Sequence, residues 1–395
     1  MPRILFLTER FPPDLGGLAA SSGRIARALC EIGWEVDVLI WSRLLQAGEL
    51  RRGDGEPASP RLRIFRLGRF RHWDMTLPLT LNLVEGFHRT RPYDAVWGHY
   101  LFPAGFAATW FGKLVNIPST VSLRGNDVDR EMFPPGDMAR LTWTLEHAGA
   151  ITSVSRDLAR KVEMLAGRTD TIVLKNAVDA ELFAPGPPDM ALRRSLGIED
   201  DEIVLGFSGE VREKKGQKHL VEALAAVQKR RPACLLLIGE VRPSAVPALQ
   251  LGLPGQPGVE RVIVTGHLEE PLAVAEHLRL CDVYLQPSLW DGLPNALLEA
   301  MACGLVVVAS DAGGIPDAVT HLQDGFLVPR WELHRLGEAV LEVLEHASGE
   351  QLAQVRRAAR ERMFTEFSPE SERERLRSVL ARLAGVPRPA TPYTS

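Results

Sequence analysis

Short apolar runs alternate with amphipathic stretches along most of the chain. This alternation is typical of βαβ units, in which a parallel sheet is covered by helices. In the first half we predict helices over Ser21–Ile32 and Gly136–His147, and strands over Arg3–Thr8, Val36–Trp41, Leu62–Leu67, Ala95–His99, Ser119–Leu123, Ala150–Ser155 and Thr171–Lys175. In the second half we predict strands over Ile203–Ser208, Cys234–Ile238, Val262–Thr265, Val283–Gln286, Leu305–Ala309 and Phe326–Val328.

A segment rich in proline and glycine, Ala184–Asp189, separates the two series of strands. Its composition indicates a hinge, and 395 residues exceed what one hydrophobic core normally covers. We therefore predict an α/β protein of two Rossmann-like domains, residues 1–184 and 185–366. Three helices close the chain, and a proline-rich tail, 385–395, is predicted to be disordered. The helices are Trp331–His346, Leu352–Glu366 and Pro369–Leu383.

Composition excludes several classes of protein. Hydrophobic residues make up 45% and charged residues 24%, as in ordinary globular proteins, and the net charge of −4 gives no reason to expect nucleic acid. The four cysteines form no C-x-x-C pair, which favours buried thiols and a reducing, cytoplasmic compartment over disulfides or a metal site. No metal-ligand spacing, dinucleotide fingerprint, signal peptide or membrane-spanning run is present.

The most informative segment, Pro287–Gly304, leads from a strand end through a glycine loop into a helix. Pro294 is predicted at the first helical position, where a missing N–H costs nothing. The free N–H groups of Asn295, Ala296 and Leu297 would then face an anion such as a phosphate. Glu299 follows about 6 Å further along the axis, where its carboxylate could accept from two vicinal hydroxyls. The alternative is a solvated acidic loop followed by a charged helix face.

This segment resembles the signature of the retaining nucleotide-sugar glycosyltransferases of family 4, the glycosyl transferases group 1. That signature is an acidic residue, seven intervening residues and a glutamate, followed by Ala-Met-Ala-x-Gly, and the acidic pair here is Asp291 and Glu299. The family usually has glutamate at the first position, so Asp291 shortens the reach by one methylene. Val306–Asp317 is also similar to the family's buried strand and Gly-Gly turn, with Asp317 at the place of a usual glutamate.

The resemblance implies the GT-B fold, in which two Rossmann-like domains with mostly parallel sheets face a central cleft. It also implies that the last helix, 367–384, crosses back to the N-terminal domain. The implied enzyme needs no metal and no cofactor, because the nucleotide-diphosphate sugar is itself the donor substrate.

The segment Gly209–Gly216 carries the cations that the family aims at the departing diphosphate. Lys215 matches the family's lysine. The arginine position holds Glu210, so Arg212 is the candidate substitute. Fixed cations stabilise the negative charge that grows on a leaving diphosphate. A solvated charged turn is the alternative for both residues.

Three further sites in the first half match the family. The Gly16–Gly17 turn lets backbone N–H groups approach a ligand, and in the family this loop lies over the donor diphosphate. His99 ends a strand, as the matching histidine does, on the acceptor side. Arg124 stands where the family commonly has histidine, and is either a catalytic cation or half of a structural pair with Asp127 or Asp129.

These matches define the predicted site residues. The catalytic candidates are Asp291, Lys215, Arg212 and Arg124, and the acceptor-side candidate is His99. The predicted donor-binding residues are Gly16, Gly17, Arg212, Lys215, Gly266, Asp291, Gly292, Leu293, Asn295, Ala296, Leu297 and Glu299. No residue is assigned to a metal.

Five arginines alternate with apolar residues over Arg61–Trp73. Alternation of period two predicts a strand with its arginines on the wet face. A basic and aromatic surface could instead hold the protein against anionic lipid at the inner face of a membrane.

We therefore predict a retaining glycosyltransferase that moves a sugar from a nucleotide-diphosphate donor to a hydroxyl acceptor, lipid-linked acceptors included. Polysaccharide, glycolipid or other glycoconjugate biosynthesis would use such a reaction. Two alternatives stay open: a sugar-nucleotide epimerase of the same fold, and a sensor that binds nucleotide sugars without turnover.

Overall fold

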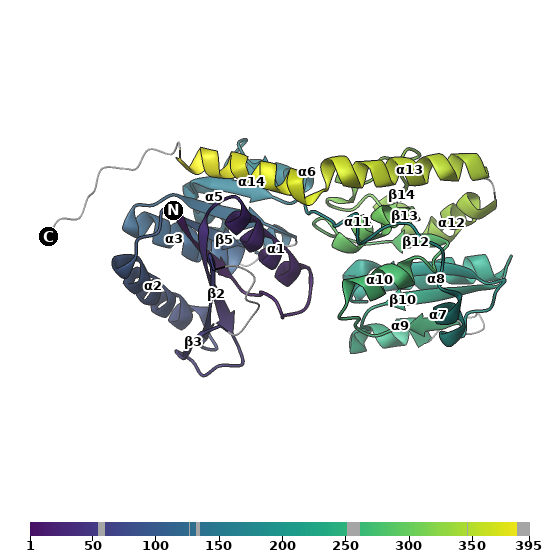
Figure 1. Cartoon of the computed structure of the whole chain (residues 1–395), viewed down its shortest axis with the longest axis horizontal. Coiled ribbons are helices and arrows are strands. Elements are labelled where there is room, and N and C mark those ends of the chain that lie inside the picture. The colour runs from purple at the N-terminus through teal and green to yellow at the C-terminus, as the bar shows by residue number, and fades with distance from the viewer. Residues whose placement is uncertain (54–59, 126, 132–134, 251–260, 346, 385–395) are drawn as a thin grey trace. The chain divides into compact units, whose positions relative to one another are not determined.

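The computed structural model describes residues 1–53, 60–125, 127–131, 135–250, 261–345 and 347–384. The chain divides into two compact units (Figure 1). The first unit contains Met1–Asn176 together with the residues from Glu372 onward, and the second contains Ala177–Ser371. The division thus falls between Asn176 and Ala177, ahead of the proline-rich segment Ala184–Asp189.

The first unit is built on an eight-stranded sheet with the order β3-β4-β2-β1-β5-β6-β7-β8 among the described residues. All neighbouring strands are parallel except β3, which runs antiparallel to β4. The strands are β1 Arg3–Thr8, β2 Glu35–Ser42, β3 Leu50–Arg52, β4 Leu62–Gly68, β5 Ala95–His99, β6 Ser119–Leu123, β7 Ala150–Ser153 and β8 Ile172–Val173.

Helices cover both faces of this sheet, and its central strands are buried throughout. The residues of β1 and β5 are all buried, and alternate side chains of β1 enter two separate cores. The helices are α1 Gly17–Glu31, α2 Trp73–Thr90, α3 Phe106–Val115, α4 Asp127–Glu131, α5 Pro135–His147 and α6 Arg156–Ala166, and a π turn, Leu101–Gly105, precedes α3.

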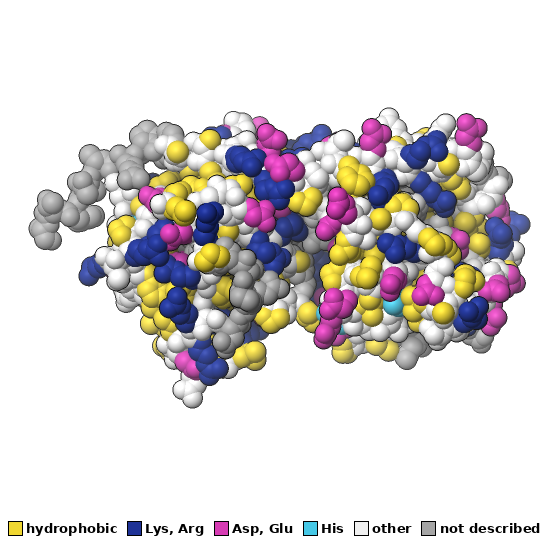
Figure 2. All heavy atoms as spheres, in the orientation of Figure 1, with side chains coloured by type: hydrophobic (Ala, Val, Ile, Leu, Met, Phe, Trp, Pro, Cys, Tyr) yellow, Lys and Arg dark blue, Asp and Glu magenta, His cyan; other side chains and the backbone are white. Residues whose placement is uncertain are grey.

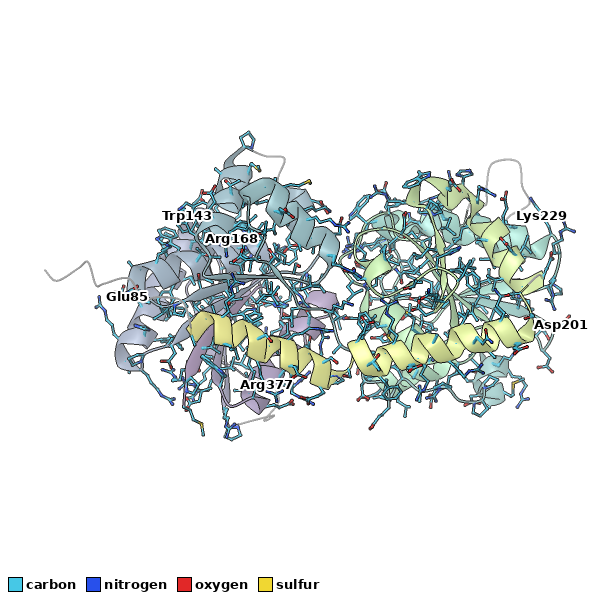
Figure 3. All side chains as sticks on the ribbon, turned by 90° about the horizontal axis from the view of Figure 1, so that it is seen from above. Glu85, Trp143, Arg168, Asp201, Lys229 and Arg377 are labelled. Atoms are coloured by element: carbon cyan, nitrogen blue, oxygen red, sulfur yellow. The ribbon has the colours of Figure 1, made fainter. Side chains whose placement is uncertain are left out.

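The last helix, α14 (Pro369–Ala384), joins the first unit from Glu372 onward. Its apolar side chains enter the same core as Ile4 and Ile25, and they are Leu376, Val379, Leu380 and Leu383. Glu372 is 1% exposed and accepts two hydrogen bonds from Arg24 Nε on α1, at 3.1 and 2.8 Å. Figure 3 shows this helix, with Arg377 labelled beside it.

The second unit contains a parallel six-stranded sheet with the order β11-β10-β9-β12-β13-β14 among the described residues. The strands are β9 Ile203–Ser208, β10 Ala233–Ile238, β11 Val262–Val264, β12 Val283–Gln286, β13 Val306–Ser310 and β14 Phe326–Val328. The helices are α7 Met190–Ser195, α8 Gln217–Gln228, α9 Val246–Gln250, α10 Pro271–Leu278, α11 Asn295–Ala302, α12 Leu336–Glu345 and α13 Gly349–Glu366.

Strand β9 is the topological switch point of this sheet. The chain continues from β9 to β10 on one side, whereas β12 lies on the other side of β9. In open α/β sheets, ligands bind beyond the carboxyl ends of the strands at such a point. Asp201, before β9, and Lys229, after α8, lie at one end of the unit in Figure 3, where strands begin.

Most strand predictions are confirmed to within one or two residues at each end. The strand predicted over Thr171–Lys175 is only Ile172–Val173, and β3 was not predicted. Helix α1 is Gly17–Glu31, so it begins four residues before the predicted start at Ser21. The tail predicted to be disordered, 385–395, lies outside the described residues.

Two sequence predictions concern the whole chain. All four cysteines are buried and free, as predicted. Within the part of the chain that the structure describes, no helix combines the length and apolar character needed to cross a membrane.

Candidate active site

Two loops meet at the switch point of the second unit: one follows β9 and the other follows β12. The first loop ends in the 3-10 turn Glu213–Lys215 and in Gly216, whose φ is +74°. A Cβ atom on Gly216 would lie 1.9 Å from the carbonyl oxygen of Pro287. Only glycine fits such a contact at a positive φ, so Gly216 lets the two loops pack against each other.

Lys215 and Asp291 form an ion pair where these loops meet, although 76 residues separate them in sequence. Their side chains are only 16% and 13% exposed. The second carboxylate oxygen of Asp291, Oδ1, accepts from the N–H of Gly292 at 3.0 Å. The structure thus brings together two of the predicted catalytic residues.

A third loop supports Asp291 from the end of β13. Gly313 has a φ of +54°, and a Cβ there would lie 1.8 Å from the carbonyl oxygen of Asp291. The N–H of Gly314 approaches the same oxygen at 3.4 Å. The Gly-Gly turn predicted from the sequence therefore packs against the backbone carbonyl of Asp291 and supports it. We call this turn, Gly313–Gly314, the seat of Asp291.

The charges around Asp291 shift two pKa values. Burial alone would raise the pKa of the Asp291 carboxyl, but the ammonium groups of Lys215 and Lys214 bring it below its ordinary value. Burial, together with the neighbouring cations Lys215 and Arg212, lowers the pKa of Lys214 to about 8, although the charge of Asp291 opposes this shift. The loop after β9 thus concentrates positive charge beside one carboxylate.

Helix α11 begins directly after the Asp291 loop. Pro294 is the N-cap with an extended ψ of 123°, so the prediction that it occupies the first helical position was wrong by one residue. The N–H groups of Asn295, Ala296 and Leu297 form the first turn, where no intrahelical acceptor exists. Leu293 is buried, and Glu299 lies in the next turn, partly buried.

Two other predicted donor-site residues, Arg212 and Gly266, follow β9 and β11. The guanidinium of Arg212 pairs with Glu210 at 3.4 Å, and Glu210 also binds Arg242 at 2.5 Å. The Nε of Arg212 is buried without a hydrogen-bond partner among the described residues. Gly266 follows the edge strand β11, two strands away from β9.

In the first unit, Gly16 lies in the loop after β1, and His99 is the last residue of the adjacent strand β5. Gly16 is the N-cap of α1 with a φ of 108°, and open space surrounds it and Gly17. The Nε2 of His99 lies 2.9 Å from the hydroxyl of Ser21 on α1, whereas its Nδ1 is buried without a partner among the described residues. Burial, with the nearby charges of Arg124 and Arg24, holds the pKa of His99 well below its usual range.

Arg124 follows β6 and binds neither Asp127 nor Asp129 through its guanidinium. Its Nη1 donates to the carbonyl of Leu174 at 3.1 Å, and its Nη2 donates to the side-chain oxygen of Asn176. Asp127 instead accepts from the backbone N–H of Arg124 at 3.2 Å. The structural Arg–Asp pair that the sequence left open is therefore replaced by a contact with Asn176.

The arginine-rich segment forms the predicted strand, β4. Arg63 is not fully solvated, because its guanidinium binds both oxygens of the buried Asp37 at 2.6 Å each. Arg66 donates to the carbonyl of Pro12 at 3.1 Å. Part of the basic character of this strand is thus used inside the unit.

Sequence reasoning missed four residues at the switch point. They are Lys214 and three buried polar residues on one side of the β12 segment: Tyr284, Gln286 and Ser288. A signal was available, because a polar residue at every second position of a buried strand leaves each one needing a hydrogen-bond partner.

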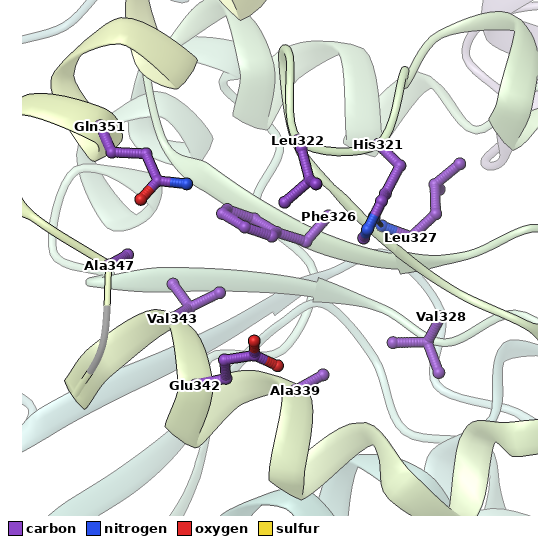
Figure 4. A pocket seen from close by; sticks show the side chains of 10 residues that line it. All are labelled: His321, Leu322, Phe326, Leu327, Val328, Ala339, Glu342, Val343, Ala347 and Gln351. Atoms are coloured by element: carbon purple, nitrogen blue, oxygen red, sulfur yellow. Dashed lines mark hydrogen bonds between the residues drawn. The ribbon is translucent and has the colours of Figure 1, made fainter.

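A cavity of about 240 Å³ lies among β14, α12 and α13 (Figure 4). Its lining is largely apolar, with His321, Glu342 and Gln351 as the polar exceptions. It contains none of the predicted site residues. Among the described residues, no group of three or more His, Cys, Asp or Glu side chains could hold a metal ion.

Comparison with known proteins covers both units. Residues 202–346 match the family model described as Glycosyl transferases group 1, and residues 16–177 match the Glycosyl transferase 4-like domain. Together the two matches span well over half of the chain.

Curated relatives match across both halves. The chain is 28% identical over 320 residues to a GDP-mannose-dependent monoacylated alpha-(1-6)-phosphatidylinositol monomannoside mannosyltransferase of Corynebacterium glutamicum, covering 77% of this chain and 80% of the relative. It is also 28% identical over 346 residues to a D-inositol 3-phosphate glycosyltransferase of Jonesia denitrificans, covering 80% of each. Among solved structures, sucrose-phosphate synthase from Thermosynechococcus elongatus gives a TM-score of 0.79 at 19% identity, covering 98% of this chain and 100% of that one.

Proposed function

Because the chain belongs to the glycosyl transferases group 1 family and has the GT-B fold, we propose that it is a retaining glycosyltransferase independent of metal ions and cofactors. It transfers a sugar from a nucleotide-diphosphate donor to a hydroxyl acceptor. The observation that carries this proposal is the Lys215–Asp291 pair beside the open first turn of α11.

The donor roles follow from the charges and hydrogen-bond donors at this point. The diphosphate lies against Lys215, Arg212 and the N–H groups at the start of α11, because a helix N-terminus and fixed cations both favour an anion. The ribose hydroxyls bind Glu299, one turn along the helix. The sugar binds Asp291, with Gly292, Leu293 and Gly266 as further donor contacts.

The reaction breaks the bond between the anomeric carbon of the sugar and the phosphate oxygen. A new bond forms from the acceptor hydroxyl oxygen to the same carbon on the same face of the sugar. The acceptor proton passes to the departing phosphate oxygen, and the cations at the end of β9 stabilise the charge that remains. His99 on the acceptor side, and Gly16, Gly17 and Arg124 in the first unit, keep the roles that the family resemblance assigns them.

The acceptor is a hydroxyl compound of polysaccharide, glycolipid or glycoconjugate synthesis. The names of the relatives, a phosphatidylinositol mannoside mannosyltransferase and an inositol phosphate glycosyltransferase, support a polyol acceptor, free or lipid-linked. Lys and Arg side chains gather over the β2, β3 and α2 region of the first unit (Figure 2), which supports action in the cytoplasm at the inner face of a membrane.

Two substitutions test the donor site. Thermal shift with UDP-, GDP- and ADP-sugars first identifies the donor, because a ligand of the native state raises its apparent stability. Glu299→Ala should then raise the donor KM about tenfold or more with a smaller change in kcat, since it removes a hydrogen-bonded ribose contact. Asp291→Asn should lower kcat at least tenfold while the fold is kept.

The controls separate the alternatives. Glu222→Gln changes a carboxylate on α8 that binds His219, and it should leave donor kinetics unchanged. An epimerase would convert one donor into another with no acceptor present, which NMR of the donor detects. A sensor would bind donor without turnover. Wild-type donor hydrolysis and transfer in both site variants would overturn the assignment.

A further inference from the structure

Three side chains behind Asp291 are buried and spaced two residues apart: Tyr284, Gln286 and Ser288. Side chains two apart in an extended strand point to the same face. Each of the three is 0% exposed, so each polar group must find its partner inside the protein.

Their hydrogen bonds form a chain with one direction. The Tyr284 hydroxyl donates to Gln286 Oε1 at 3.0 Å, which turns the amide nitrogen of Gln286 toward Ser288. That nitrogen donates to Ser288 Oγ at 2.9 Å. Since Ser288 Oγ already accepts, its own proton is left for Asp291 Oδ2, 3.4 Å away.

The chain limits the rotation of the Asp291 carboxylate. Its Oδ1 is held by Gly292 and its Oδ2 by Lys215 and Ser288. Lys215 alone would leave the carboxylate plane free to turn, because an ammonium group has three rotatable donors and no preferred plane. Ser288 supplies a donor at a fixed point on the strand end.

We propose that Ser288, with Gln286 and Tyr284 behind it, is a positioning residue that fixes the Asp291 carboxylate against Lys215 for sugar transfer. This inference rests on the proposed function. Ser288 acts through Asp291 and does not touch the substrate. Its hydroxyl matters for turnover more than for donor binding, because Asp291 faces the reacting sugar.

Ser310 offers a matched control. It is also a 0% exposed serine, and its hydroxyl donates to the carbonyl oxygen of Ser288 at 2.6 Å without reaching Asp291. Ser288→Ala removes the hydrogen bonds to Gln286 and Asp291, and Ser310→Ala removes those to the carbonyl oxygens of Ser288 and Gln286. Their effects on stability should therefore be similar, and their effects on turnover should differ.

The kinetic test compares kcat and donor KM of both variants with the wild-type enzyme. Ser288→Ala should lower kcat about 10- to 100-fold, the effect of losing a hydrogen bond to a charged group, with donor KM within about twofold. Tyr284→Phe, which removes only the hydroxyl at the far end, should give a smaller loss in kcat. Equal kcat losses in Ser288→Ala and Ser310→Ala would overturn the proposal.

A second readout is independent of activity. Asp-selective ¹³C NMR follows the Asp291 carboxyl, with Asp291→Asn for assignment. Ser288→Ala should raise the pKa of Asp291, because the ionised carboxylate loses a donor, and Ser310→Ala should leave it unchanged. If the wild-type protein turns over no nucleotide sugar, the proposed function fails. The NMR titration of Asp291 then tests by itself whether Ser288 holds the Asp291 carboxylate. An unchanged Asp291 pKa in Ser288→Ala would overturn the inference.

Discussion

At the scale of single residues, burial decides which ionisable groups are ready to act. His99 is buried and its pKa is lowered, so it is neutral at physiological pH and can accept a hydrogen bond. The Asp291 side chain is 13% exposed, and the neighbouring ammonium groups keep it ionised. The partners differ, because the nearby cations Arg124 and Arg24 oppose protonation of His99, whereas Lys215 and Lys214 stabilise the negative charge of Asp291.

Lys214 provides a prediction at this scale. Its folded pKa of about 8 lies below the ordinary value of 10.5, so between these pH values the unfolded chain binds more protons. Stability that depends on Lys214 therefore rises with pH over this window. Between pH 7 and pH 9.5 the wild-type protein should gain about 1–2 kcal/mol in free energy of unfolding relative to Lys214→Met.

Chemical denaturation at the two pH values measures this difference. Lys218→Met is the matched control, because the Lys218 side chain is 69% exposed and pairs with Glu222 only at the surface. Its difference from the wild-type protein should be the same at both pH values. A pH-independent difference for Lys214→Met would contradict the pKa of Lys214.

At the scale of elements, glycines at positive φ hold the loops of the site together. Gly216 joins the loop after β9 to the loop after β12, and Gly313 joins the loop after β13 to Asp291. Each contact is to a backbone carbonyl, which cannot move away as a flexible side chain could. The three loops are therefore one rigid support for the Lys215–Asp291 pair.

Gly313→Ala tests the seat of Asp291. The new Cβ would lie 1.8 Å from the carbonyl oxygen of Asp291, so the loop must shift. We expect a loss of about 3 kcal/mol in stability and at least a tenfold loss in kcat. Gly167 is a control with a similar φ of +64° but open space around it, and Gly167→Ala should cost only about 1 kcal/mol and no activity. Equal kcat values in the two variants, measured beside their unfolding curves, would argue against the seat.

The sequence predicts those strands in which nearly every residue is buried. Strands β1 and β9 each contain a short apolar run, 4–7 and 203–207, which identifies them. Strand β3 is not identifiable, because Leu50–Arg52 is exposed and two-thirds arginine. It exists through pairing with β4, a contact that no local pattern encodes.

The candidate site divides in the same way. Lys215, Asp291 and Glu299 are found by motif, because their spacing along the chain carries the information. The partners of the site residues are set by packing. Lys215 binds Asp291, which lies 76 residues away in sequence, and the guanidinium of Arg124 binds Asn176 and not the nearby aspartates. Hydrogen bonds between distant loops depend on the order of the strands in the sheet. The sequence predicts the fold class but not this order.

At the scale of the whole molecule, α14 stabilises the first unit from the far end of the chain. Glu372→Ala leaves Arg24, whose side chain is 22% exposed, without its bidentate carboxylate. Removing one partner of a buried pair should destabilise the first unit by about 3 kcal/mol. Hydrogen exchange of the β1 and β5 amides reports this, since the second unit has its own core.

Glu374→Ala serves as the control on the same helix, because Glu374 is exposed. Its effect on exchange should be within about 0.5 kcal/mol. Similar exchange rates in the two variants would mean that the Arg24–Glu372 pair does not hold the helix.

The interleaved order of the two units has a consequence for synthesis on the ribosome. The first unit is complete only when Glu372 and the residues after it emerge, and roughly 200 residues of the second unit are translated in between. At 5–20 residues per second, the apolar side chains that pack with Leu376 and Val379, Ile4 and Ile25 among them, wait about 10–40 s for these partners. The nascent chain therefore exposes apolar side chains during that interval. A chaperone bound to translating ribosomes would bind these side chains.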